Sequence, residues 1–277
     1  MSRKKSRAAG DVLFYAGMIA LAVIVTVPFY WMIATSLKSK GALMALPIQW
    51  IPAQPTLAAY EKVFSMFPFL RAIFNSAFIT VMYTAITVLS ASMAAFAITK
   101  IRFPGANALF AVYLASMMIP TQITLIPLFL IMNKLSLVNT YTSVISPAVF
   151  RAFGIFLLVQ NMRSLPDDYV EAARIDGAGM GRIYARIILP MCRAALATLT
   201  ITTFMEAWND YLWPLVMLSD KHKMTLTLAL NTLNGQYGTE YNVLMAGSLL
   251  SMLPIIAVYI AAQTQMKQGI TVGGVKG

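Results

Sequence analysis

Charged residues are scarce in this sequence. Only 11% of the 277 residues are charged, whereas 59% are apolar, and a typical soluble domain has about 25% charged residues. A soluble fold of this length cannot hide so much apolar surface, so the composition argues against a water-soluble enzyme. Disorder is excluded as well, because disordered chains are rich in charge and poor in apolar residues. The composition therefore indicates a membrane protein.

Residues that form disulfides and metal sites are nearly absent. Cys192 is the single cysteine and His222 the single histidine, which excludes an intrachain disulfide and a multi-histidine metal site. The sequence also lacks a G-x-x-x-x-G-K-[ST] loop for ATP phosphates, and it lacks the G-x-S-x-G and H-E-x-x-H motifs. We therefore expect no catalytic residue, no metal and no cofactor bound by this chain.

Long apolar runs are what the sequence has instead. A membrane-spanning helix needs about 20 mostly apolar residues, and the expected spans are residues 12–34, 72–99, 107–132, 141–162, 191–218 and 241–266. Strands of a membrane barrel would alternate apolar and polar residues, which these runs do not do. The first run is longer than the apolar region of a signal peptide, which has about 7–15 residues. We expect an all-α membrane protein with six transmembrane helices in a single domain, residues 1–277.

The basic residues predict an orientation. If the N-terminus lies inside, thirteen of the 21 lysines and arginines fall in inner segments and seven in outer segments, while Arg151 lies within a span. Basic residues are enriched in cytoplasmic loops. We therefore expect a multi-pass protein of a bacterial-type cytoplasmic membrane, with both termini in the cytoplasm. The net charge of +11 then needs no nucleic-acid partner.

The inner loop between the fourth and fifth spans, residues 164–190, has the features of a docking element. Ser164 is expected to cap a helix whose first turn contains Pro166, and Gly177 suits the left-handed residue that ends it. A second short helix is expected at about 180–188. The apolar stripe of the first helix is expected to consist of Leu165, Tyr169, Ala172 and Ala173.

This loop resembles a known family. Glu171-Ala172-Ala173, Asp176-Gly177 and Ile187-Ile188-Leu189-Pro190, with nine residues before the last group, resemble the EAA loop of ABC importer permeases. Three further segments are similar to maltose-type carbohydrate permeases: Phe103-Pro104-Gly105, Trp208-Asn209-Asp210-Tyr211-Leu212-Trp213-Pro214 and the glycine-rich end from Gln268 to Gly277.

The resemblance implies a function and a set of partners. The chain would be a permease subunit that translocates a sugar or oligosaccharide, with a polyol phosphate as an alternative cargo. Its partners would be a second permease, two ATP-binding subunits or domains that hold ATP and Mg²⁺, and an extracytoplasmic sugar-binding protein. The cytoplasmic tail is expected at residues 267–277, and its last part, Thr271 to Gly277, would either slide between the two ATPase subunits or be a frayed terminus. The residues implied to couple to the ATPase are Glu171, Ala172, Ala173, Asp176, Gly177, Ile187, Leu189 and Pro190.

Ionisable residues inside the expected spans suggest a polar path. Glu206 and Asp210 are four residues apart in the fifth span and so share a helix face, while Arg151 lies in the fourth. Such groups are costly in a bilayer and usually face a bundle interior or water. With Asn209 they form either a translocation path or a structural polar network; Arg151 is expected to pair with Glu206 in preference to contacting an anionic substrate. The neighbouring aromatic residues, which either stack on sugar rings or belong to an interfacial belt, are Trp208, Tyr211 and Trp213.

The outer loop at residues 219–240 is polar. Maltose-type permeases carry a finger at this position that contacts the binding protein, and the residues expected to do so here are Asn231, Asn234, Gly235 and Gln236. The alternative is a plain surface loop.

Two other functions remain open from the sequence. An ion-coupled secondary transporter could use Glu206 and Asp210, but such proteins often contain internal repeats, and no second half mirrors the first. A membrane anchor or sensor would leave the polar residues of the fifth span unexplained.

Overall fold

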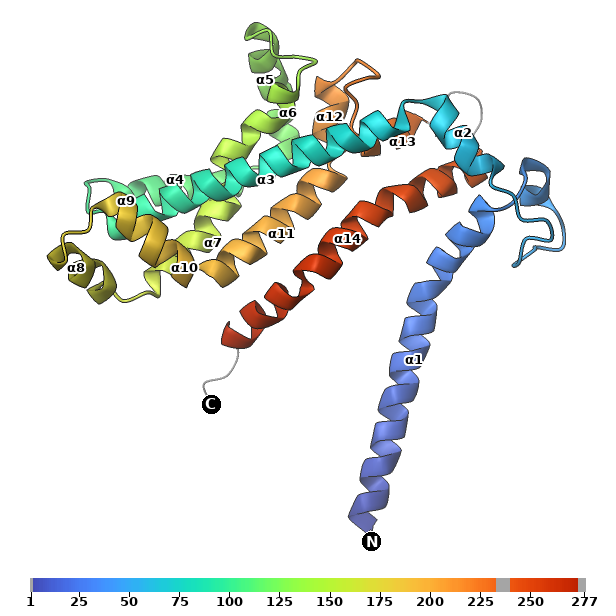
Figure 1. The fold of residues 1–277 in the computed structure, drawn as a ribbon, viewed down its shortest axis with the longest axis horizontal. Helices are drawn as coiled ribbons and strands as arrows, with labels where there is room; N and C mark the ends of the chain where they lie inside the picture. Colours follow the sequence, from blue (N-terminus) through green and yellow to red (C-terminus); the bar gives the residue numbers. More distant parts are fainter. Residues whose placement is uncertain (1, 233–239, 274–277) are drawn as a thin grey trace. The chain divides into compact units, whose positions relative to one another are not determined.

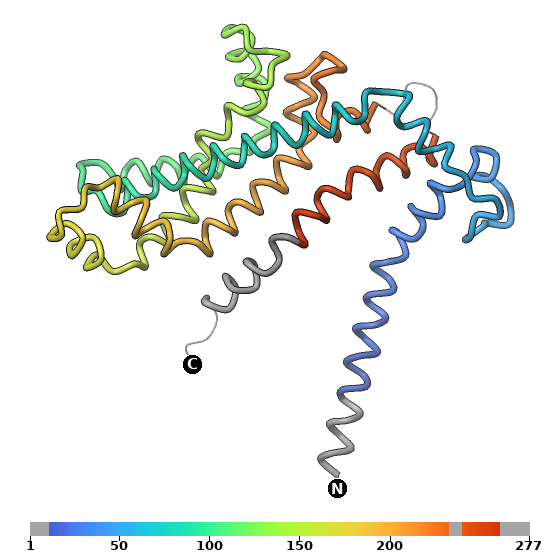
Figure 2. Tube along the Cα trace, viewed as in Figure 1, coloured from blue at the N-terminus to red at the C-terminus, as the bar shows by residue number. Residues whose placement is uncertain are grey.

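The computed structural model describes residues 2–232 and 240–273, and within them it contains helices, turns and no strand (Figures 1 and 2). This confirms the all-α class expected from the sequence. The chain divides into two compact units, one of residues 1–69 and 230–252 and the other of residues 70–229 and 253–277.

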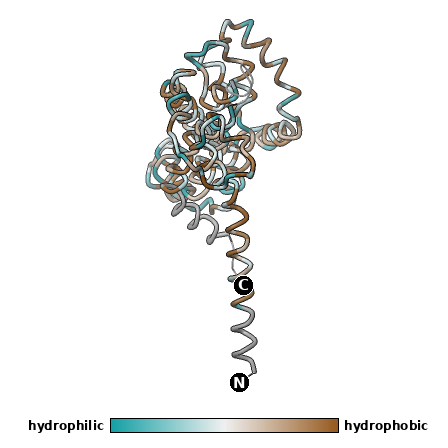
Figure 3. Tube along the Cα trace, turned by 90° about the vertical axis from the view of Figure 1, so that its right-hand side faces the viewer, coloured by the Kyte–Doolittle hydropathy of each residue, from teal (hydrophilic) through white to brown (hydrophobic). Residues whose placement is uncertain are grey.

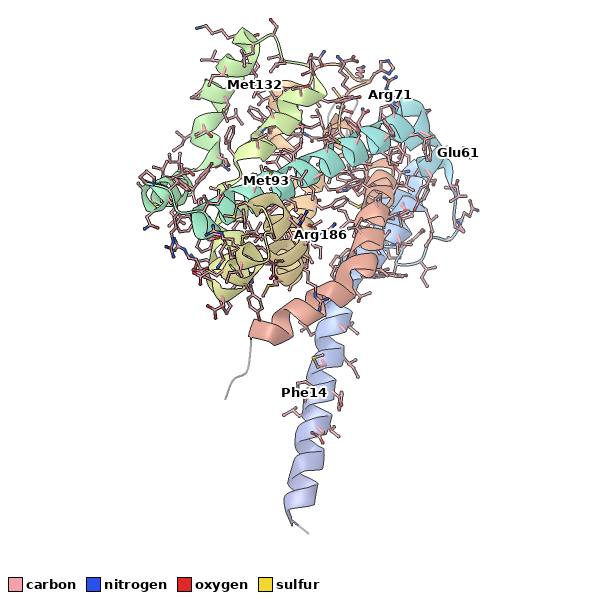
Figure 4. The ribbon with its side chains drawn as sticks, turned by 60° about the vertical axis from the view of Figure 1, so that its left-hand side comes forward. Phe14, Glu61, Arg71, Met93, Met132 and Arg186 are labelled. Carbon is pink, nitrogen blue, oxygen red and sulfur yellow. The ribbon has the colours of Figure 1, made fainter. Side chains whose placement is uncertain are left out.

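The first unit contains α1 (Ser2–Ser36), a 3₁₀ helix (Lys40–Met44), α2 (Ala58–Met66) and the beginning of α14 (Tyr241–Gly273). Apolar residues dominate α1 from residue 11 onward (Figure 3). Their side chains project away from the helix, as Phe14 does with 64% of its surface exposed (Figure 4). Such a helix gains stability only where lipid or another protein covers it.

The second unit holds the remaining helices. They are α3 (Phe69–Lys100), α4 (Ala106–Ser116), α5 (Thr121–Lys134), α6 (Tyr141–Ile145), a 3₁₀ helix (Ser146–Phe150), α7 (Ala152–Arg163), α8 (Asp168–Ile175), α9 (Met180–Ile183), a π-helical turn (Tyr184–Ile188), α10 (Leu189–Met191), α11 (Arg193–Asn209), α12 (Leu212–Met217) and α13 (Leu226–Thr232).

The core of this unit forms around α7. Its residues Leu158, Val159 and Met162 are completely buried among side chains of α3, α4, α8 and α11. Gly154 allows the close approach, because a β-carbon there would lie 3.1 Å from Ala91 Cβ on α3 and 3.2 Å from Leu199 Cδ1 on α11. Small residues at helix contacts are typical of membrane bundles.

Four helical stretches in the described residues are long and apolar enough to cross a membrane: Asp11–Ser36, Phe69–Lys100, Tyr141–Arg163 and Tyr241–Ile260. Two bent pairs raise the number to six if each counts as one span. They are Ala106–Ser116 with Thr121–Lys134, bent by 104°, and Met180–Met191 with Arg193–Asn209, bent by 80°.

Two of the expected spans bend sharply at a break between helices, and a third, at 141–162, is interrupted without such a bend by a 3₁₀ helix and the extended residue Arg151. The expected helix at 107–132 breaks after Ser116, and the one at 191–218 breaks after Asn209. A proline, Pro120 or Pro214, follows shortly after each break. Proline has no N–H to bond the carbonyl four residues earlier, and its ring clashes with that carbonyl.

The last helix is longer than expected. The sequence predicts a sixth span that ends at 266, followed by a tail at 267–277. In the structure, α14 continues to Gly273. Residues 274–277 lie outside the described part of the chain.

Candidate functional site

A cavity of about 400 Å³ lies inside the second unit, beside the break between α11 and α12. Most of its wall is apolar, and most of the lining residues come from α5, α11 and α12. The polar residues in the wall are Tyr83, Thr121, Thr124, Arg151, Glu206, Asn209 and Asp210. The four residues that the sequence assigns to a polar path, Arg151, Glu206, Asn209 and Asp210, therefore line one cavity.

The helix break fixes the side chains at one edge of this cavity. Asp210 accepts a hydrogen bond from the Trp213 backbone N–H at 3.4 Å, and Asn209 Nδ2 donates to the Met205 carbonyl at 2.8 Å. Trp213 also lines the cavity, and its Nε1 donates to the Ser143 carbonyl of α6 at 3.0 Å. The bond from Trp213 Nε1 holds the start of α12 against α6.

Arg151 forms an ion pair with Glu206, the pairing favoured from the sequence. The guanidinium carbon of Arg151 also lies 6.0 Å from the centre of the Tyr83 ring, within the range of a cation–π contact. Arg151, the residue just before α7, thus contacts Glu206 of α11 and Tyr83 of α3.

The other aromatic residues of this segment have different positions. Trp208 is 4% exposed and lies parallel to Phe204, with ring centres 6.0 Å apart. Its carbonyl accepts a hydrogen bond from Thr227 Oγ1 at 3.0 Å. Trp208 and Tyr211 are absent from the cavity wall, so Trp213 alone of the three aromatics lies beside the polar residues.

The loop at 164–190 folds into an elbow, defined here as residues 164–191, which contain α8, α9 and α10. Gly177 has a φ of +77° and lies between α8 and α9, the left-handed geometry expected there. The expected cap is wrong, because Ser164 Oγ donates to the Asn161 carbonyl and α8 begins at Asp168. The second expected helix is also interrupted, since α9 ends at Ile183 and a π-helical turn follows.

The elbow is bound firmly to the core of its unit. Lys100, at the end of α3, donates to the Leu165 carbonyl at 2.7 Å and to Asp167 Oδ1 at 2.6 Å, and its side chain is 3% exposed. Ser92 and Tyr184 share a hydrogen bond of 2.7 Å between their hydroxyls. The hydrogen bond from Lys100 lowers the pKa of Asp167, with the ammonium charge adding to the effect.

The buried face of α8 differs from the expected stripe. Val170 and Ala173 are buried, three residues apart on one helix face, while Tyr169 is 51% exposed and Ala172 is also exposed. Val170 and Ala173 belong to the core around α7, so packing against that core determines which face of α8 is buried.

The outer face of the elbow carries polar and apolar side chains. Ile175 is 87% exposed. Of the residues expected to couple to an ATPase, those that are exposed are Glu171, Ala172, Asp176, Gly177 and Pro190; Ile187 and Leu189 are half-buried and Ala173 is buried.

The segment after α12 contains both described and undescribed residues. Asn231 is exposed on α13, whereas Asn234, Gly235 and Gln236 lie outside the described residues. The start of the segment is held by two asparagines that the sequence analysis missed. Asn139 Oδ1 accepts from the backbone N–H groups of Ser219 and Asp220, and Asn75 Nδ2 donates to the carbonyls of His222 and Met224.

A second polar cluster in the first unit was also missed. Glu240 accepts hydrogen bonds from Lys40 at 3.0 Å and from Lys62 at 2.6 Å, joining the 3₁₀ helix and α2 to the residue before α14. Asn242 Nδ2 donates to the Lys38 carbonyl at 3.0 Å. These contacts are far apart in the sequence, so no local pattern signals them.

Comparison with known proteins identifies the family. A family model described as "Binding-protein-dependent transport system inner membrane component" matches residues 86–272. The chain belongs to this family. Within the described residues, no group of three or more His, Cys, Asp and Glu side chains is placed to hold a metal.

Several known proteins resemble the chain over nearly its whole length. The arabinooligosaccharides transport system permease protein AraQ of Halalkalibacterium halodurans is 36% identical, over 96% of each chain. The lactose transport system permease protein LacG of Rhizobium radiobacter is 29% identical, again over 96% of each. A chain in the crystal structure of a bacterial ABC transporter that imports the acidic polysaccharide alginate superimposes with a TM-score of 0.83 at 24% identity, covering 94% of this chain and 97% of that one. At that identity the likeness shows the fold alone.

Proposed function

We propose that this chain is a membrane-spanning permease subunit of an ATP-driven importer and that its cargo is a sugar or oligosaccharide. Family membership and the full-length similarity to permeases named for arabinooligosaccharides and lactose support the cargo. The observation that carries the mechanism is the elbow, which exposes a docking face while its other face is part of the core.

The elbow suits the transmission of force. Lys100 and Ser92 bind it to α3, and its buried side chains pack on α7 and α11. A close-packed core of this kind moves as a body, because packed interiors transmit strain. An ATPase that displaces the outer face of the elbow would therefore move the helices that line the cavity.

The cavity is the proposed segment of the translocation path in this subunit. Its amide and carboxylate groups can hydrogen-bond hydroxyls, and Trp213 adds an aromatic face. Such a mixture of apolar wall and a few convergent polar groups is typical of small-molecule sites.

The assembly implied by this function follows the family. We propose a second permease, two ATP-binding subunits that hold ATP and Mg²⁺, and an external sugar-binding protein as partners. The protein would lie in a bacterial-type cytoplasmic membrane with six spans, counting each bent pair as one, and with both termini in the cytoplasm.

Co-purification tests this proposal. The tagged chain, expressed with a candidate second permease and a candidate ATPase from the same organism, should purify as a complex whose ATP hydrolysis rises when sugar-loaded binding protein is added. A chain that purifies without an ATPase, yet transports its cargo, would be a secondary transporter and would contradict the proposal.

A further inference from the structure

The cavity contains a positive charge that is already engaged. Arg151 is the one basic residue among the described residues of the cavity wall. Its guanidinium is paired with the Glu206 carboxylate and also lies near the Tyr83 ring. An anionic ligand would have to displace Glu206 before it gained a full ion pair with this arginine.

A second carboxylate lies in the same wall. Asp210 accepts a hydrogen bond from the Trp213 backbone N–H but has no ion-pair partner in the described part of the chain. Arg151, Glu206 and Asp210 in their charged forms therefore leave one excess negative charge. The side chains of Arg151 and Glu206 are 32% and 53% exposed, and at such partly exposed positions nearby unit charges still interact roughly four times more strongly than in bulk water. The excess negative charge therefore repels an entering anion.

The fold alone does not determine whether the cargo is charged or neutral. The solved structure described above, which shares the fold, belongs to an importer of an acidic polysaccharide, whereas the relatives named AraQ and LacG are named for arabinooligosaccharides and lactose. Selection between a charged and a neutral cargo must therefore come from the side chains that line the cavity.

We infer that the cavity beside the α11–α12 break discriminates against anionic cargo and accepts uncharged, hydroxyl-rich molecules, with Arg151 serving as the counter-ion of Glu206 and not as a cargo ligand. This inference rests on the proposed function. Sugar hydroxyls can donate to Asp210 and Glu206 and can pair with the Asn209 amide, whereas a carboxylate, phosphate or sulfonate meets the excess negative charge.

A cysteine placed in the cavity wall measures how the charge of the cavity affects small charged reagents, without any cargo. Thr124→Cys places a thiol in the cavity wall, and Cys192→Ser removes the native thiol, which is buried. The complete complex in membranes is treated with two thiosulfonate reagents of similar size, one bearing a trimethylammonium group and one a sulfonate. Each labelling rate is divided by the rate of the same reagent with a free thiol in solution, and on this normalised scale we expect the cationic reagent to label the reporter several-fold faster. Equal labelling, or faster labelling by the sulfonate reagent, would overturn the inference.

Two matched variants identify the role of the ion pair. Glu206→Gln and Asp210→Asn each remove one negative charge, but only the first also leaves Arg151 without its carboxylate partner. The amide introduced by Asp210→Asn would keep an oxygen that can accept from the Trp213 N–H. We expect E206Q to accelerate the sulfonate reagent more than D210N does. Equal acceleration by both variants would show that Glu206 does not mask Arg151.

A charge swap covers the case in which E206Q fails to accumulate. Arg151→Glu combined with Glu206→Arg preserves both the pair and the net charge, so it should retain the preference for the cationic reagent. Loss of that preference would contradict the inference. Failure of the proposed function has a different signature, because the unmodified complex would then show no ATP-dependent sugar uptake whatever its reagent preference.

Discussion

At the residue scale, Lys100 is the contact that joins the elbow to a long helix. A buried lysine is costly unless its ammonium is hydrogen-bonded, and here the ammonium is satisfied by the Leu165 carbonyl and the Asp167 carboxylate. Both acceptors lie just before α8, so their position depends on this side chain.

Lys100→Met should uncouple ATP hydrolysis from transport. Methionine keeps the apolar stem but removes the donors, so the elbow loses its bond to α3. We expect several-fold less sugar taken up per ATP hydrolysed in reconstituted vesicles. Asp167→Asn should have a smaller effect, because the Asp167 side chain is 64% exposed and asparagine keeps an acceptor.

Lys134→Met is the control for this series, since Lys134 also ends a helix but is exposed. It should couple normally. Normal coupling in a well-assembled K100M complex would show that Lys100 does not position the elbow.

Gly177 is required by the turn between α8 and α9. Its φ of +77° is rarely adopted by other residues, although no atom outside the neighbouring residues lies within 4 Å of a β-carbon built there. Leucine at position 177 would therefore destabilise the turn by about 1–2 kcal/mol through its backbone geometry. Its side chain would also obstruct the exposed docking face.

Gly177→Leu should leave the protein in the membrane but abolish stimulation of ATP hydrolysis by loaded binding protein. Gly177→Asn is the matched variant, because asparagine tolerates the left-handed conformation, and it should retain much of the stimulation. An unaffected G177L complex would contradict the assignment of the elbow.

Glu240 gives the first unit a pH-dependent contact. The hydrogen bonds from Lys62 and Lys40 lower the pKa of Glu240. A carboxylate with a lowered pKa stabilises the fold at pH values above its unfolded pKa of about 4.3, and this contribution is lost as the pH falls through the lowered pKa.

Glu240→Gln should therefore lower the melting temperature slightly at pH 7, and the difference from the unmodified protein should shrink as the pH falls below about 4. The effect is small because both lysine side chains are substantially exposed. Glu61→Gln serves as the control, since Glu61 forms no ion pair in the described residues (Figure 4). A difference in melting temperature that stays constant as the pH falls would show that the ion pairs of Glu240 with Lys40 and Lys62 do not stabilise the fold.

At the scale of the elements, α7 depends on a small residue at its contacts with α3 and α11. Gly154→Leu would push a side chain into Ala91 and Leu199, and overpacking of this kind typically costs about 1–3 kcal/mol. We expect a clear loss of thermal stability by fluorescence-detected size exclusion. Gly17→Leu in α1, where no atom outside the neighbouring residues lies within 4 Å of a β-carbon, should cause little loss; equal losses would argue against tight packing at Gly154.

The sequence predicts where helices occur better than where they break. Long apolar runs identify the helical segments, and the positive φ of Gly177 follows from its place after a helix-forming stretch. The prolines do not distinguish breaks from continuous helices, since Pro28, Pro127 and Pro254 lie inside helices while breaks precede Pro120 and Pro214. Neighbouring helices decide the outcome by satisfying the freed backbone groups.

The candidate site is predictable only in part. The pairing of Arg151 with Glu206 follows from the cost of burying charge and is present in the structure. The roles of Asn75, Asn139 and Lys100 depend on backbone groups distant in sequence. Side chains that bond backbone carbonyls or amides leave no pattern of residue types, so a single sequence does not reveal them.

At the scale of the whole molecule, the elbow and the cavity both belong to the second unit, and packed side chains connect them. The elbow presents an exposed face and the cavity lies beside a broken helix, and α11 packs into the same core as the elbow. Movement imposed on the elbow therefore reaches the cavity wall through packed side chains. In the assembly proposed above, an ATPase would drive this movement.

Transport in sealed vesicles tests the central claim most directly. The complete complex is reconstituted with ATP inside; outside are the binding protein and a labelled uncharged sugar that this binding protein binds. The account predicts accumulation of the sugar that requires ATP and binding protein and that persists when ion gradients are dissipated. Accumulation without ATP, driven by an imposed ion gradient, would contradict the account.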